Sequence, residues 1–152
     1  MSGELTSVVT HSAEETRALG AQLARSLGPG DVVALHGELG SGKTCLIQGI
    51  CAGLGVEGHV TSPTFILINE YRGLRRGVSL PVYHLDLYRL RSTAELEDLG
   101  VEEYFYGQGV SLVEWAERAG DLLPPRRREA SLEYVDSSAR RIQVRLLSPP
   151  PG

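Results

Sequence analysis

Residues 36–46 read HGELGSGKTCL and contain the spacing of a phosphate-binding loop, Gly37-x-x-x-x-Gly42-Lys43-Thr44. Such a loop needs glycine because its backbone N–H groups turn inward toward phosphate oxygens, through conformations that a Cβ would obstruct. The lysine brings a point charge to the β- and γ-phosphates, and the threonine hydroxyl is a ligand for Mg²⁺. The helix expected after the loop adds the positive end of its dipole. These residues therefore predict a site for a nucleoside triphosphate and Mg²⁺.

Lys43 is the only lysine in the chain, and every other basic residue is an arginine. A lysine ammonium is compact, whereas a guanidinium is planar and larger, so the two are not interchangeable inside a tight loop. We therefore expect Lys43 to act directly at the phosphates. No Asn-Lys-x-Asp sequence, which would read guanine, follows the loop. ATP is the expected nucleotide.

Nucleotide chemistry of this kind also needs an acid on the metal side, commonly at the end of a strand beside the loop. Asp86 follows the mostly apolar run at 81–85, and its alternative role is a helix cap or turn. Glu114 ends the run VSLVE and is a second candidate. It would serve either as a metal ligand through water or as the group that orients the attacking water.

Three further residues have both a structural and a functional interpretation. Thr64 belongs to the polar stretch TSPT, which is either a turn entering a strand or a switch whose hydroxyl senses the γ-phosphate. His84 lies inside an expected buried strand and is interpreted as a hydrogen-bonded core residue. Trp115, the only tryptophan, is by itself more typical of a core than of a contact surface.

Strands and helices alternate along the chain. Strands are expected at 5–10, 32–36, 64–71, 81–87, 110–113, 131–135 and 140–147, with an exposed turn at 72–77. Helices are expected after Ser12, after Lys43 and from Ser92 to about Leu99. The alternation predicts an α/β fold, a P-loop NTPase-like three-layer sandwich with a mostly parallel central sheet and antiparallel C-terminal strands.

The chain has 152 residues, of which 41% are hydrophobic, and this is the size of one domain. We expect a single ATP-hydrolysing domain over 1–147 and a disordered tail at 148–152. A net charge of −4 means that the surface as a whole does not attract nucleic acid. No apolar run has membrane-spanning length and no signal-peptide core is present. A cytoplasmic protein without a membrane partner is expected.

Five motifs together resemble the bacterial TsaE family, formerly YjeE. They are GELGSGKT, TSPTFILINEY, YHLDLYRL, ELEDLGVEEY and VEW, in this order, and the resemblance covers roughly residues 12–117. Proteins of that family are small ATPases that work with TsaD and TsaB to install threonylcarbamoyladenosine at position 37 of tRNAs reading codons that begin with A. The resemblance implies Mg²⁺-dependent ATP hydrolysis, weak alone and stimulated by TsaD and TsaB, with tRNA contacted indirectly through their complex.

The resemblance also implies roles for individual residues. Thr44 and Glu114 would serve the magnesium, and Asp86 would occupy the acidic strand-end position. Thr64 would take the switch position, and Thr16 would belong to an opening helix near the nucleotide. The phosphates would be held by the whole loop, which consists of Gly37, Glu38, Leu39, Gly40, Ser41, Gly42, Lys43 and Thr44. Beside Glu114, Trp115 would report or transmit nucleotide state, and Arg140 and Arg141 are candidates for the wall of an adenine site.

Two alternatives from other functional classes remain open at this stage. In a small-molecule kinase, Asp86 would be the base, Arg89 an anion clamp, and the stretch PPRRRE a mobile arginine lid; the same arginines are otherwise a solvated loop. Little chain is left to build an acceptor site, which disfavours the kinase. In a non-hydrolysing adaptor, the ATP and ADP states would differ only around Thr64.

Overall fold

A computed structural model describes residues 2–38, 40–58, 60 and 68–148. Seven strands form one sheet in the order β1-β7-β6-β2-β5-β4-β3. Pairs β6–β2, β2–β5 and β5–β4 are parallel, and the outer pairs β1–β7, β7–β6 and β4–β3 are antiparallel. The strands are β1 (Ser2–Thr10), β2 (Val32–His36), β3 (Ile68–Arg75), β4 (Val78–Asp86), β5 (Val110–Glu114), β6 (Arg127–Tyr134) and β7 (Arg140–Leu147).

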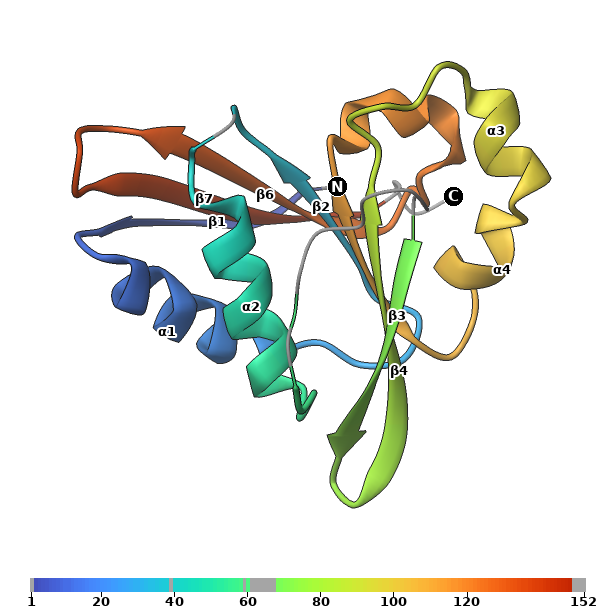
Figure 1. Ribbon diagram of the computed structural model, residues 1–152, viewed down its shortest axis with the longest axis horizontal. Helices are drawn as coiled ribbons and strands as arrows, with labels where there is room; N and C mark the ends of the chain where they lie inside the picture. The colour runs from blue at the N-terminus through green and yellow to red at the C-terminus, as the bar shows by residue number, and fades with distance from the viewer. Residues whose placement is uncertain (1, 39, 59, 61–67, 149–152) are drawn as a thin grey trace.

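Helices cover the two faces of this sheet. The helices are α1 (Ala13–Ala24), α2 (Lys43–Gly53), α3 (Thr93–Asp98), α4 (Val101–Phe105) and the 3-10 helix η1 (Ala116–Leu122). Figure 1 shows α1 and α2 side by side on one face, with α3 and α4 on the other side of the sheet. Each face carries its own apolar cluster, one around Leu46, Ile50 and Leu112 and the other around Leu96, Phe105 and Val113. The three-layer α/β sandwich predicted from the sequence is confirmed, with its parallel strands at the centre of the sheet.

The two helices on the first face touch through glycine. A Cβ added to Gly49 of α2 would overlap the backbone carbonyl of Arg17 in α1, and one added to Gly20 would lie 2.8 Å from the backbone nitrogen of Ile50. Helix backbones therefore meet with no side chain between them at this point. The contact holds α1 against the helix that follows the phosphate loop.

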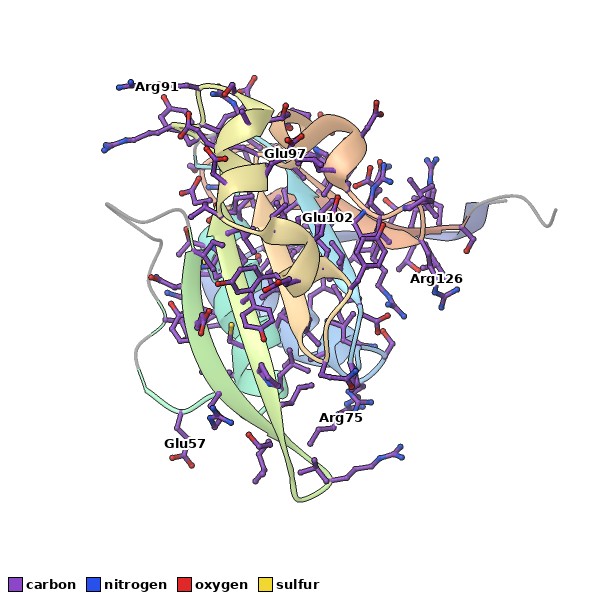
Figure 2. The ribbon with its side chains drawn as sticks, turned by 90° about the vertical axis from the view of Figure 1, so that its right-hand side faces the viewer. Glu57, Arg75, Arg91, Glu97, Glu102 and Arg126 are labelled. Carbon is purple, nitrogen blue, oxygen red and sulfur yellow. The ribbon has the colours of Figure 1, made fainter. Side chains whose placement is uncertain are left out.

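The segment 72–77 was expected to be an exposed turn, and this is wrong. Strand β3 continues to Arg75, and the turn is reduced to Arg76 and Gly77, with φ of 51° and 79°. Arg75, labelled in Figure 2, donates to the carbonyls of Ala24 and Arg25 at the end of α1, at 3.2 and 2.9 Å. Because the guanidinium satisfies carbonyls at a helix end, an arginine-rich stretch becomes part of the packed structure.

Candidate functional site: a phosphate loop beside two strand-end acids

The loop between β2 and α2 has the conformation that its glycines predict. Gly37, Gly40 and Gly42 have φ of 153°, 81° and 102°. A Cβ on Gly37 would lie 2.6 Å from Ser41 Oγ and 2.7 Å from the carbonyl oxygen of Leu132, so this position accepts no side chain. Strand β2 is fully buried up to Leu35, so its end is fixed by packing, and α2 starts directly at Lys43. The loop is therefore held at both ends.

Lys43 lies inside the loop and is 5% exposed. Its Nζ donates to the carbonyl oxygen of Gly37 at 2.5 Å and lies 3.9 Å from the centroid of the Trp115 ring. Burial lowers the pKa of the Lys43 ammonium below its ordinary value, and the carboxylates of Glu114 and Asp86 oppose that shift. The single lysine of the chain thus sits in a desolvated position facing acidic groups.

Asp86 and Glu114 end neighbouring parallel strands and are paired in register. Burial is the largest cause that raises the pKa of the Asp86 carboxyl, and the nearby Glu114 raises it further. The backbone N–H of Tyr88 donates to Asp86 Oδ1 at 3.0 Å and opposes the shift. Glu114 is 4% exposed, and its Oε2 lies 2.7 Å from Nε2 of His84. The expectation that His84 is a hydrogen-bonded core residue is confirmed, and its partner is a candidate site residue.

A cleft of about 370 Å³ brings these residues together, and we call it the phosphate cleft. It is lined by Gly40, Gly42, Lys43, Thr44, Cys45, Asp86, Tyr88, Glu114, Trp115 and Arg140. A second cavity of about 360 Å³ shares Gly42, Cys45 and Arg140 with it and extends to Thr16 and Ser138. Four residues proposed from separate parts of the sequence, Lys43, Thr44, Asp86 and Glu114, therefore face one space.

Four further predicted residues are Ser41, Glu38, Leu39 and Thr64. Ser41 is buried inside the loop, and its Oγ has no hydrogen-bond partner among the described residues. Glu38 is exposed, and its carbonyl oxygen accepts from the N–H of Ser41 at 3.1 Å. Leu39 and Thr64 lie outside the described residues.

Thr16, in α1, borders the second cavity. Its side chain is buried, and its Oγ1 lies 2.7 Å from Thr10 Oγ1 and 3.3 Å from the carbonyl of Ser12, to which it donates. A Cβ on Gly42 would lie 3.9 Å from the Thr16 methyl group. Helix α1 therefore lies beside the phosphate loop at Gly42.

Arg140 and Arg141, the two candidates for an adenine wall, point to different places. Arg140 lines both cavities, and its Nε donates to the carbonyl of Gly40 at 3.0 Å. Its guanidinium also lies 4.6 Å from the ring centroid of Tyr134. Arg141 pairs with Glu133 at 3.3 Å and lines neither cavity. Of these two arginines, only Arg140 lines the candidate site.

The arginines at 126–128 do not lie at the cleft. Strand β6 begins at Arg127, and Arg128 pairs in parallel register with Val33, near the start of β2. The phosphate loop follows the opposite end of β2, beyond His36. Arg128 Nη1 forms an ion pair with Asp31 at 3.3 Å, and Arg126 in Figure 2 points away from the body of the protein. Both earlier interpretations, an arginine lid and a solvated loop, are wrong for Arg127 and Arg128.

One cluster beside the loop was not predicted from the sequence. His36, the last residue of β2, lies 2.9 Å from Glu129 and 3.2 Å from Glu117. Its hydrogen bond to Glu129 is the largest cause that raises its pKa. Burial is the largest single effect on the pKa of Glu129 and raises it, but the hydrogen bonds and charges of His36 and Arg127 together outweigh burial and lower that pKa. Glu129 belongs to β6 and Glu117 to η1, so the cluster ties two elements to the start of the loop.

The residues present fit a magnesium nucleotide. The buried Ser41 Oγ lacks a partner among the described residues, and a phosphate oxygen would satisfy it. Lys43 supplies positive charge, and the hydroxyl and carboxylate oxygens of Thr44, Asp86 and Glu114 are the ligand type that Mg²⁺ prefers.

The fold and the cleft together define a P-loop protein of the α/β class. The family model described as "Threonylcarbamoyl adenosine biosynthesis protein TsaE" matches residues 10–142. The chain belongs to the TsaE family, whose members take part in tRNA threonylcarbamoyladenosine biosynthesis. No helix in the described part of the chain is long and apolar enough to cross a membrane.

Individual relatives agree with this assignment. A TsaE protein of Bacillus subtilis is 45% identical over 133 residues, which are 88% of this chain and 80% of the relative. The TsaE protein of Treponema pallidum is 40% identical over 90% of this chain and 97% of its own length. A crystal structure of Bacillus subtilis YdiB superposes with a TM-score of 0.77 at 37% identity, and the match covers 97% of this chain and 88% of that one.

Proposed function

We propose that this protein hydrolyses ATP with Mg²⁺, and that its cycle supports formation of threonylcarbamoyladenosine at position 37 of tRNA in a complex with TsaD and TsaB. The observation that carries the proposal is the meeting of Lys43, Thr44, Asp86 and Glu114 in one cleft. Membership of the TsaE family supports the assignment to tRNA threonylcarbamoyladenosine biosynthesis. The proposed role is cytoplasmic, with tRNA reached through the partners and no membrane involved.

Each residue has a defined task in this proposal. The N–H groups of the loop bind phosphate oxygens, and the Lys43 ammonium neutralises charge that develops on the transferred group. Thr44, Glu114 and Asp86 would hold Mg²⁺ directly or through water, and the bound ion would supply Lewis-acid polarisation of the phosphate oxygens. The second cavity, which shares Arg140 with the phosphate cleft, receives the nucleoside. Thr64 is proposed as the switch residue.

The test follows the γ-phosphate of labelled ATP, first with the protein alone and then with TsaD, TsaB and unmodified tRNA. We expect release of inorganic phosphate, faster with partners, and lost in Lys43→Ala and Glu114→Ala. Arg126→Ala, which removes an exposed charge far from the cleft, is the matched control and keeps full activity.

Two outcomes would contradict the proposal. Label transferred to a small acceptor, regardless of partners, would make the protein a kinase. A Lys43→Ala variant that still supports tRNA modification would instead favour the non-hydrolysing adaptor.

A further inference from the structure

The strongest unassigned feature is the buried pair between His84 and Glu114. His84 is 1% exposed, and it precedes Asp86 by two residues, so both side chains lie on the same face of β4. Glu114 lies on the adjacent strand, opposite Asp86. Its Oε2 is 2.7 Å from Nε2 of His84, while the residue also lines the phosphate cleft. A core histidine thus contacts a cleft carboxylate directly.

The polar surroundings of the ring decide which nitrogen carries the proton. Nδ1 of His84 is buried and has no hydrogen-bond partner among the described residues. A proton on Nδ1 alone would bury an unpaired donor and would place two acceptors, Nε2 and a carboxylate oxygen, 2.7 Å apart. The imidazole therefore donates from Nε2 to Glu114.

This hydrogen bond has a competitor. Lys43 interacts electrostatically with Glu114 across the cleft, yet within the described ranges no salt bridge joins the two side chains. The ammonium instead contacts the Gly37 carbonyl and the Trp115 ring. A flexible glutamate next to a buried ammonium would otherwise close onto it, and both groups would then be lost to a ligand.

We propose that His84 is a positioning residue that holds the Glu114 carboxylate away from Lys43 and leaves its Oε1 free to face the phosphate cleft. The consequence for ligand binding rests on the function proposed above. In that setting, His84 orients a magnesium ligand in the way that outer-shell hydrogen bonds commonly do. It does not touch the nucleotide itself.

The test compares three substitutions of His84. In His84→Gln the amide nitrogen extends about as far as Nε2 and can still donate to Glu114. In His84→Asn the shorter amide does not reach, and His84→Leu fills the space without a donor. The first measurement is the affinity for a non-hydrolysable ATP analogue with and without Mg²⁺, by calorimetry. We expect the gain in affinity from Mg²⁺ to fall about 10-fold or more in the Leu and Asn variants and to be restored in the Gln variant.

Nucleotide binding without Mg²⁺ should also weaken in the Asn and Leu variants, because a Glu114 carboxylate that closes onto Lys43 occupies the ammonium, and it should stay at the wild-type level in His84→Gln. Equal Mg²⁺ dependence of His84→Gln and His84→Asn would overturn the proposal. This comparison holds even if His84→Leu fails to fold, since both amide variants keep a polar side chain of modest size.

A second measurement needs no nucleotide and separates this proposal from the proposed function. In the Asn variant, Glu114 should turn toward Lys43 and draw its ammonium from the Trp115 ring, which changes the emission of the only tryptophan. Identical emission of the unliganded Asn and Gln variants would overturn the positioning role. Failure of the wild type to hydrolyse ATP with its partners would instead overturn the proposed function alone.

Discussion

At the scale of single residues, the site depends on positions where nothing larger fits. Gly37 and the buried Ser41 contact each other across the loop, and Lys43 returns to the Gly37 carbonyl. The spacing of the sequence motif predicts these contacts within the loop well, because the spacing determines a local backbone path. It does not predict that the Lys43 ammonium stacks on Trp115, since that ring arrives from the end of β5.

A substitution of Gly37 tests this description. In Gly37→Ala the added Cβ would lie 2.7 Å from the carbonyl of Leu132 and would push the loop outward. We expect a cost of about 1–3 kcal/mol, which corresponds to roughly 2–12 °C in Tm for a chain of this size, together with loss of nucleotide affinity. Thermal unfolding and calorimetry measure the two effects. Gly28→Ala is the control, because its Cβ meets nothing within 4 Å. Equal Tm values for the two variants would contradict the close packing of the loop.

At the scale of elements, the contact between α1 and α2 fixes the helix that follows the phosphate loop, and so helps to position the loop. Gly49→Ala would drive a Cβ into the backbone of α1 at Arg17 and separate the helices. The expected cost is about 3 kcal/mol or more, above the usual range for overpacking, because backbone cannot repack. Urea unfolding should show a lower midpoint with an unchanged m value. Ala52→Ser, on the exposed side of α2, is the control. A midpoint equal to that of the control would mean that the helices separate without cost.

The cluster that joins β2, β6 and η1 predicts a pH dependence. His36 has a raised pKa, so its contribution to stability is complete below its ordinary value of 6.5 and is lost as pH rises through the raised pKa. Glu129 has a lowered pKa, so its contribution is complete above 4.5 and is lost as pH falls through the lowered pKa. The Tm difference between wild type and His36→Gln should therefore be largest between about pH 4.5 and 6.5.

Thermal unfolding across pH 4 to 9 measures that difference, with a substitution of the exposed His11 by Gln as control. A difference that does not shrink toward pH 9 would rule out the ionic contribution.

The same cluster could not have been predicted from the sequence. His36 is separated from Glu117 and Glu129 by 81 and 93 residues, and only the order of strands brings them together. Most strands were predicted within a few residues because their apolar runs are local, whereas the short α4 and η1 were not predicted.

At the scale of the whole molecule, ligand binding should stabilise the entire fold, because residues of β4, β5, β7 and α2 line the cleft. An ATP analogue with Mg²⁺ at 100 times its Kd contributes about 2.7 kcal/mol, or roughly 5–11 °C in Tm. The shift should be smaller without Mg²⁺ and absent in Lys43→Ala. A thermal shift of equal size in that variant would place the nucleotide elsewhere.

The pairing of β1 with β7 bears on how the protein is made. Strand β1 lies at the edge of the sheet and, among the described strands, pairs with β7 alone. Arg140, at the start of β7, donates a hydrogen bond to the carbonyl of Gly40. A ribosome delivers β1 and the phosphate loop before β7. The phosphate loop therefore gains this support only after translation has passed Arg140, 100 residues beyond Gly40. A chain interrupted before residue 140 would contain the complete motif and still lack the edge of the sheet that holds it.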